Sequence, residues 1–359
     1  MNNNLKTEFF LGVNTPNGFY STLNNLCIPY SDWFCYILKG GPGTGKSTLM
    51  KKIAKKAQEK NLKTELIYCS SDPKSLDAVI IPEAKKCIID GTAPHVIDPI
   101  YPGACDCIIN LGECWDKKKL QSSKNEIIEL SKQNATEHSS AQKALKIHKE
   151  ISELNNKIIS KYIETEKLEK YCVRTAKSLG KAIKLQKGSK NLRFISSITP
   201  NGYIFFENTI SNLAKNIFVI EDEYNIVANK IMKSLQEKVL DMGYDVISCL
   251  SPFSPETTID AIIIPELKTA FAVKNQKISP RLFEKIPHKK VNAKRFLNSK
   301  ELSKQKNTVK FQSKLSAIFL DKSIEHLRKA LEIHDDIEKI YSYAMNYRKV
   351  NKLSSSLIL

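Results

Sequence analysis

The residues with the clearest chemical meaning lie at positions 40–48, which read GGPGTGKST. Gly40, Gly45, Lys46 and Ser47 have the spacing G-x-x-x-x-G-K-[ST], in which backbone N–H groups of a glycine-rich loop surround phosphate oxygens. In this pattern the lysine reaches the β- and γ-phosphates and the hydroxyl binds Mg²⁺. The segment therefore predicts a site for a nucleoside triphosphate such as ATP, with Mg²⁺. The predicted ligand-binding residues are Gly40, Gly41, Pro42, Gly43, Thr44, Gly45, Lys46, Ser47 and Thr48.

The elements around this loop fit the same interpretation. Residues 33–38 form an apolar run that predicts a strand, and Leu49, Ile53 and Ala57 have helical spacing behind the loop. A strand followed by a loop and a helix places the positive end of the helix dipole at the phosphates. A chance glycine-rich turn would not bring both elements with it. Further strands are predicted over 62–69, 78–81 and 87–89.

A carboxylate on a neighbouring strand is also needed to hold the metal, directly or through water. Asp90 ends the apolar run 87–89, so we predict that Asp90 and Ser47 bind Mg²⁺. Asp72 and Asp77 are the alternative carboxylates, and a turn aspartate is the structural alternative for Asp90.

The segment that follows, residues 90–116, is rich in Pro and Gly and has little periodicity. We interpret it as a loop at the ends of the strands, where open α/β sheets bind their ligands. His95 and Glu113 could orient a water molecule or an acceptor hydroxyl, with a structural hydrogen-bonding role as the alternative for each. The predicted catalytic residues are Lys46, Asp90, His95 and Glu113.

Composition sets the class of protein. The chain has 359 residues and a formal net charge of +18, with 56 Lys+Arg against 38 Asp+Glu. Only six of these cations are Arg, the side chain best suited to nucleic acid, and the lysines follow predicted helices as on solvated faces. No apolar run is long enough to span a membrane or resembles a signal peptide, so we expect a cytoplasmic protein. The nine cysteines, including Cys105-x-Cys107, fit no familiar zinc spacing and are interpreted as reduced thiols.

The chain contains an internal repeat. TPNG occurs at 15–18 and at 199–202, and IPE occurs at 81–83 and at 264–266. KALKIH at 143–148 returns as KALEIH further along, in the same order. These matches predict an α/β protein made by tandem duplication of a P-loop NTPase core, a parallel sheet with flanking helices, in which each copy carries a long helical arm.

The second copy has lost the chemistry of the loop. The segment ILKGGPGTGKSTLMKKI aligns with VIEDEYNIVANKIMKSL, which begins at Val219. Acids replace the first glycines, and carboxylates at a helix N-terminus satisfy its free N–H groups and repel phosphates. We therefore predict a self-capped, inactive loop, with cation binding or contact with a lysine-rich helix as alternatives. The replacements are Gly40 by Asp222, Gly41 by Glu223, Gly45 by Val227, Lys46 by Ala228, Ser47 by Asn229 and Asp90 by Val273.

Domain boundaries follow from the repeat. We predict an active core at 1–116, a helical arm and linker at 117–190, a degenerate core at 191–290 and a second arm at 291–359. The best candidate junction between copies is KGSKNLRF, which begins at Lys187.

The two arms are expected to pack on each other through apolar seams. His148 lies beside the first seam and His334 within the second, both interpreted as packing residues. The lysine-rich outer faces could bind a protein or nucleic-acid partner, and the oligomeric state stays open. The predicted seams are Ile147, Ile151, Leu154 and Ile158 in one arm, and Leu320, Ile324, Leu327, Leu331 and His334 in the other.

The order of these motifs resembles a family of tandem, double-copy P-loop ATPase-like proteins from Firmicutes bacteria. The resemblance covers nearly the whole chain and is most specific at DGTAPHVIDP and INLGECWD, which begin at Asp90 and Ile109. It implies ATP binding through Gly43, Gly45, Lys46 and Ser47, and no particular substrate. Gly91 stands where many P-loop hydrolases have a catalytic Glu, so the water-activating residue stays open.

Three functions are compatible with one intact P-loop. The first is a Mg²⁺-dependent ATPase whose second copy is regulatory, and the alternatives are a small-molecule or nucleotide kinase and a non-hydrolysing switch or scaffold. A kinase should have an arginine-bearing lid, yet the first Arg after the P-loop is Arg174. An arginine that stabilises the transition state would have to be Arg174, Arg193, Arg281 or one from another chain. These observations favour the ATPase.

Overall fold

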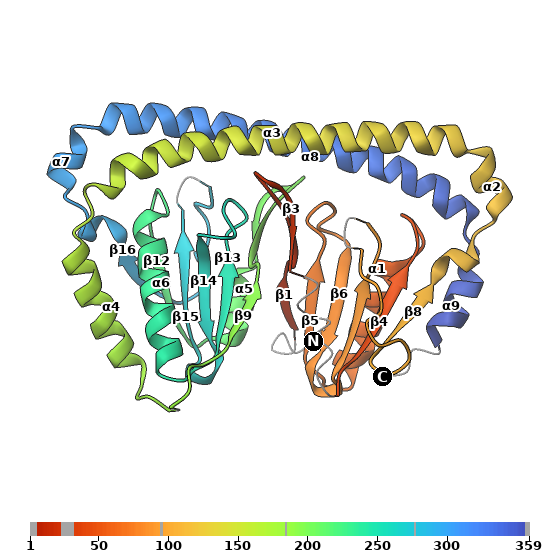
Figure 1. Cartoon of the computed structure of the whole chain (residues 1–359), viewed down its shortest axis with the longest axis horizontal. Helices are drawn as coiled ribbons and strands as arrows, with labels where there is room; N and C mark the ends of the chain where they lie inside the picture. The colour runs from red at the N-terminus through yellow and green to blue at the C-terminus, as the bar shows by residue number, and fades with distance from the viewer. Residues whose placement is uncertain (1–5, 23–31, 94–95, 184, 276–277, 356–359) are drawn as a thin grey trace.

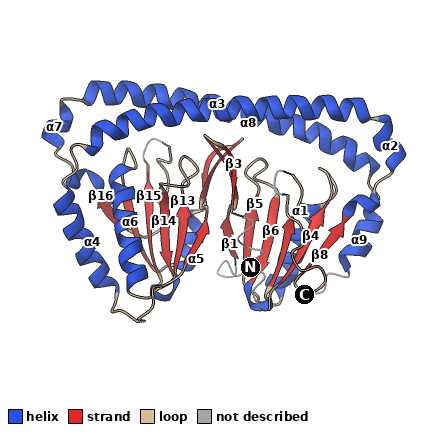
Figure 2. Ribbon diagram, viewed as in Figure 1, coloured by secondary structure: helices blue, strands red, loops and turns tan. Residues whose placement is uncertain are grey.

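The computed structural model describes residues 6–22, 32–93, 96–183, 185–275 and 278–355. It has a mixed α/β architecture in which two six-stranded sheets stand side by side under a pair of long helices (Figure 1, Figure 2). Within the described part of the chain, no helix combines the length and apolar character that a membrane span requires.

The first sheet has the strand order β1-β5-β6-β7-β4-β8. β6 runs antiparallel to both of its neighbours, whereas the other three pairings are parallel. The prediction of a parallel sheet was therefore wrong at β6. The reason is the short connection at Pro82–Ala84, because so short a link can join only antiparallel strands. The strands are β1 Lys6–Phe9, β4 Phe34–Lys39, β5 Thr64–Tyr68, β6 Leu76–Ile81, β7 Lys86–Asp90 and β8 Asp106–Asn110.

The second sheet repeats this plan in the order β16-β12-β15-β14-β13-β9, and its β14 is likewise antiparallel to both neighbours. Its first strand begins at Lys190, so the segment proposed as a junction between the copies is partly strand. The strands are β9 Lys190–Arg193, β12 Asn216–Glu221, β13 Val246–Leu250, β14 Ile259–Ile264, β15 Thr269–Lys274 and β16 Lys289–Asn292.

Strand β8 and two hairpins were not predicted. β8 lies inside the segment 90–116, which was interpreted as a loop, and it completes the sheet beside β4. The hairpins β2–β3 and β10–β11 turn at the two TPNG segments. The added elements are β2 Gly12–Thr15, β3 Gly18–Ser21, β10 Ser196–Thr199, β11 Gly202–Phe205 and α5 Glu207–Leu213.

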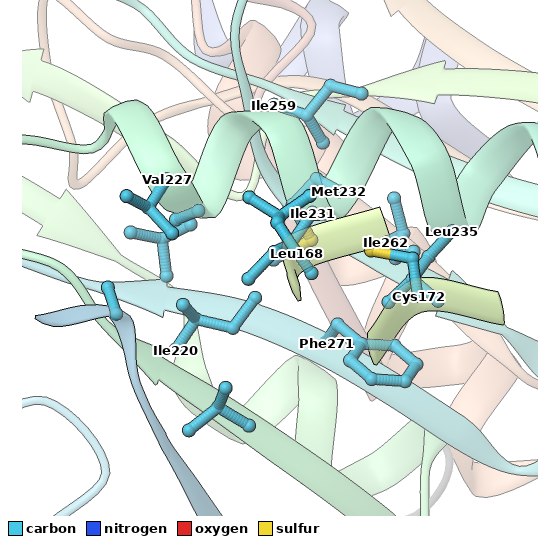
Figure 3. Close-up of a cluster of buried hydrophobic side chains, with 14 of the residues drawn as sticks. Leu168, Cys172, Ile220, Val227, Ile231, Met232, Leu235, Ile259, Ile262 and Phe271 are labelled. Atoms are coloured by element: carbon cyan, nitrogen blue, oxygen red, sulfur yellow. The ribbon is translucent and has the colours of Figure 1, made fainter. Parts of the chain in front are cut away.

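One helix covers a face of each sheet. α1, Lys46–Glu59, buries Leu49, Met50 and Ile53 against the first sheet. α6, Ile226–Asp241, does the same in the second copy, where its buried side chains lie over Ile220, Ile262 and Phe271 (Figure 3). The apolar positions with helical spacing in the sequence are thus the ones that face the sheet.

The arms cross from one copy to the other. α3, Lys124–Ser160, and α8, Lys306–Ala344, run antiparallel above both sheets (Figure 1). At the end of α3, α4 packs on α6 of the second copy, and at the end of α8, α9 contacts the first copy. The other arm helices are α2 Lys117–Ser122, α4 Thr165–Leu179, α7 Ser299–Ser303 and α9 Tyr347–Ser355.

The seam between α3 and α8 agrees with the prediction at Leu320 and Leu327 of α8, which are buried, but differs from it on α3. Ile147 and Leu154 are exposed, and α3 instead buries small and polar side chains. His148 bonds to the Ser316 backbone oxygen at 2.9 Å, and Asn134 donates to the Ala330 oxygen at 2.6 Å. On α3, small side chains and bonds to the facing backbone therefore supply part of the packing, beside Leu145, and a search for large apolar residues overlooks them. The buried residues of α3 are Ala141, Ala144, Leu145, His148, Asn155 and Ile159.

The two copies are related by an approximate twofold axis. The isolated bridges Trp115–Met345 and Ile163–Leu297 are equivalent under this symmetry. Trp115 corresponds to Leu297, and Ile163 corresponds to Met345, in each case 182 residues further along the chain. Near the axis, Phe10 pairs with its counterpart Phe194 through two backbone hydrogen bonds of 2.8 and 3.0 Å. Equivalent positions can therefore be compared directly.

Candidate functional site

A cavity of about 1470 Å³ lies between the first copy's glycine-rich loop and the paired helices α3 and α8. All nine residues of the segment 40–48 line it, together with Asp72, Asp77 and Asp90. The loop follows β4 and Asp90 ends β7, and these strands are parallel neighbours. The cavity thus opens at the carboxyl edge of the sheet, where ligands of open α/β sheets bind.

Two glycines give the loop its shape. Gly43 and Gly45 have φ angles of 66° and 88°, a region that side chains other than glycine rarely adopt. At Gly43 an added Cβ would also lie 2.6 Å from the backbone oxygen of Glu338. The Thr44 hydroxyl donates to the Gly41 oxygen at 2.9 Å and closes the turn.

Lys46 is the cation at the centre of the site. Its Nζ donates to the Gly40 and Gly41 backbone oxygens at 2.6 and 2.8 Å and lies 3.5 Å from Asp90 Oδ2. The other carboxylate oxygen of Asp90 accepts from the backbone N–H and the hydroxyl of Thr92. Burial raises the pKa of Asp90, while Lys46 and Thr92 oppose that rise.

Ser47 has a structural contact as well. Its hydroxyl accepts from the Leu76 N–H at 3.0 Å and ties α1 to the start of β6. In the second copy Asn229 accepts from the Ile259 N–H in the same way, at 3.2 Å. The hydroxyl oxygen has a further lone pair, so this contact does not exclude a cation.

The oxygen donors on the cavity wall are compatible with the predicted Mg²⁺ ion. Among the described residues no group of three or more His, Cys, Asp or Glu side chains is placed to hold a metal. Mg²⁺ commonly takes only one or two carboxylates and completes its shell with phosphates and water. Ser47 and Asp90, both on the cavity wall, fit that mode of binding, and Asp77 is near enough for its charge to raise the pKa of Asp90.

The other two predicted catalytic residues are His95 and Glu113. His95 lies outside the described residues. Glu113 is exposed and does not line the cavity, and its Oε1 accepts from Asn110 at 3.5 Å. Among the residues that the structure describes, no arginine lines the cavity. Arg174 instead bonds within α4 and Arg193 pairs with Glu65.

Gly91 explains why no glutamate follows Asp90. A Cβ at this position would overlap the Ile37 side chain and lie 3.0 Å from the Ile97 backbone oxygen. The space that a side chain at position 91 would need is therefore filled by the protein core. A water-activating carboxylate would have to come from elsewhere.

The second arm supplies residues to the loop that were not predicted from the sequence. The Gly43 N–H donates to Glu338 Oε1 at 3.1 Å, and the Ser342 and Tyr347 hydroxyls donate to the Gly43 oxygen at 3.3 and 2.7 Å. Tyr341 lies against Gly41, so α8 contacts the loop at Gly41 as well as at Gly43. The only signal in the sequence is a difference between the copies. Glu338 and Tyr347 align with Asn156 and Thr165, so the carboxylate and the phenol occur only in the second arm.

Two histidines of the arms, His138 and His334, also line the cavity near Glu338. His334 Nε2 lies 3.7 Å from Glu338 Oε1 and lowers the pKa of that carboxyl group. His138 of α3 faces the same cavity, and burial together with the charge of His334 lowers its pKa. His334 is thus a cavity residue, whereas it was predicted to be a packing residue of the seam.

In the second copy, the carboxylate of Asp222 occupies the equivalent loop. Asp222 is buried, and it accepts from the Ala228 N–H at 2.9 Å and from the Tyr224 N–H at 3.0 Å. Asn225 takes the left-handed conformation and α6 begins at Ile226, so the loop is shorter than the one before α1. Self-capping by Asp222, one of the predicted outcomes, is therefore what the structure contains.

Comparisons with models of protein families, with curated proteins and with solved structures found no match to this chain.

Proposed function

We propose that the chain binds a Mg²⁺–nucleoside triphosphate, ATP in the first instance, at the loop of its first copy and hydrolyses it. The observation that carries this proposal is the meeting of Lys46, Ser47 and Asp90 on one wall of the cavity, with Lys46 Nζ 3.5 Å from Asp90 Oδ2. Phosphoryl transfer requires mainly positioning and neutralisation of charge, which these groups supply. The second copy acts as an inactive structural partner.

Each residue has a defined role in this proposal. The N–H groups of the loop and the first turn of α1 bind phosphate oxygens. Lys46 moves its Nζ from the Gly40 and Gly41 carbonyls to the phosphates. Ser47 and Asp90 would hold Mg²⁺, which supplies positive charge to the phosphate oxygens.

One observation favours a second candidate, a switch that binds the nucleotide and hydrolyses it very slowly. The core around Gly91 leaves no room for a glutamate at that position. Hydrolysis then depends on a carboxylate from another element, and without one the bound triphosphate would persist.

The experiment follows γ-labelled ATP with Mg²⁺ through the purified chain and through the variants Lys46→Ala and Asp90→Asn. Release of labelled phosphate that both variants lose supports the ATPase. Tight binding without release supports the switch, and label on an added hydroxyl compound would identify a kinase. Unchanged release in both variants would contradict a site at this loop.

A further inference from the structure

A carboxylate of the chain occupies the phosphate loop of the first copy. Glu338 Oε1 accepts the Gly43 N–H at 3.1 Å, and Lys46 contributes an attractive charge. Loop N–H groups at a helix N-terminus attract anions in general. Glu338 therefore occupies the N–H donor and the positive field that would otherwise attract a phosphate.

The carboxylate is carried by the end of the second arm. Glu338 lies near the end of α8, and its neighbours Ser342 and Tyr347 bond to the Gly43 oxygen. His334 Nε2 lies 3.7 Å from Glu338 Oε1 and lowers the pKa of Glu338, whose side chain is an anion near neutral pH. The contact joins the loop to a residue 295 positions away in the chain.

The second copy shows what a permanent internal anion looks like. Asp222 comes from the loop itself, is 4% exposed and accepts two N–H groups. Glu338 comes from another element, its side chain is 45% exposed, and the Gly43 N–H bonds to it. A partly hydrated carboxylate of this kind can leave at much lower cost.

We propose that Glu338 is an internal competitor for the phosphate site. A triphosphate that binds the loop repels this carboxylate and takes over the Gly43 N–H, because like charges cannot share one donor. Displacement of Glu338 loosens the α8–α9 end from the loop, whereas the α3–α4 end stays packed on the second copy. The proposal rests on the nucleotide site proposed above and couples its occupancy to the paired helices.

The first test measures the affinity for Mg²⁺–ATP by calorimetry in Glu338→Gln and in the matched control Glu332→Gln. Glutamine keeps the size and an acceptor oxygen of Glu338 but removes its charge, and Glu332 is an exposed acid on the same helix. We expect Glu338→Gln to bind roughly tenfold more tightly than the wild type. Glu332→Gln should bind as the wild type does.

The second test follows the two ends of the arms by hydrogen exchange without and with Mg²⁺–ATP. Amides of residues 336–350 should exchange faster with nucleotide, and amides of the equivalent residues 154–168 should not change. Equal affinities of the wild type and Glu338→Gln, or unchanged exchange at 336–350, would overturn the competitor role alone. Failure of every variant to bind the nucleotide would overturn the nucleotide site, and this inference with it.

Discussion

The two ends of the crossed arms meet the two copies in opposite ways. Over the second copy, Ile159 and Leu168 are buried in one apolar cluster with Ile226 and Val227. Over the first copy the equivalent stretch of α8 and α9 bonds to Gly43 through Glu338, Ser342 and Tyr347, above an open cavity. Apolar burial holds whatever ligand is present, but polar bonds to a loop can be exchanged for bonds to an anion. The end over the second copy is thus held mainly by apolar burial, and we propose that a bound nucleotide alters the end over the first copy.

The largest difference in stability should appear when equivalent apolar side chains at the two arm ends are truncated. Leu168→Ala leaves a cavity in the buried cluster and should lower the free energy of unfolding by about 2–5 kcal/mol. The equivalent residue Val350 packs in a small cluster with Leu111 and Cys114, and Val350→Ala should cost only about 1–2 kcal/mol. Urea denaturation of both variants measures the difference. Equal losses would contradict the contrast between the two ends.

Substitution of Gly91 should have the next largest effect on stability. Gly91→Ala adds a Cβ that overlaps Ile37 and should destabilise the chain by about 1–3 kcal/mol. The equivalent position in the second copy is Lys274, and Lys274→Ala should stay within about 0.5 kcal/mol. Thermal unfolding of the two variants compares them. A neutral Gly91→Ala would show that the position could accept a side chain after all.

The two internal anions should differ in their effect on stability. Asp222→Ala leaves the Ala228 and Tyr224 N–H groups without their acceptor and should cost about 1–2 kcal/mol. Glu338→Ala removes a half-exposed contact and should change stability by less than about 0.5 kcal/mol. Denaturant titrations at one pH measure both. A larger loss for Glu338→Ala would mean that this carboxylate is structural rather than displaceable.

The smallest expected effect is the dependence on pH of the contribution of Asp222 to stability. Burial raises the pKa of Asp222 in the folded chain, so the folded state binds this proton more tightly than the unfolded state. Its contribution to stability therefore falls as the pH rises from the ordinary pKa of Asp through the raised one. Asp222→Asn lacks this contribution, so the wild type should lose stability relative to the variant over that range. Parallel stability curves from acid to neutral pH would contradict the burial argument.

Local patterns predicted much of the first copy. The loop 40–48, the strand before it, the helix behind it and the placement of Asp90 were recognisable because each depends on neighbours in the sequence. Comparison of the two copies likewise located the altered loop at Asp222. These features need no knowledge of how distant elements meet.

The remaining features depend on how distant elements meet. The antiparallel β6 follows from a short connection, and the seam of α3 follows from small residues that let the helices approach closely. The contact of Glu338 with Gly43 exists only because each arm crosses to the other copy. Residues so far apart in the chain carry no shared local pattern, so their meeting could not be foreseen.

The most direct test of the central claim is the number of nucleotides bound per chain, measured by equilibrium dialysis with Mg²⁺–ATP. A single phosphate site predicts one nucleotide per chain, lost in Lys46→Ala and retained in Lys230→Ala, which changes an exposed lysine of the second copy's α6. Two nucleotides per chain, or one that survives Lys46→Ala, would contradict a single phosphate site in the first copy.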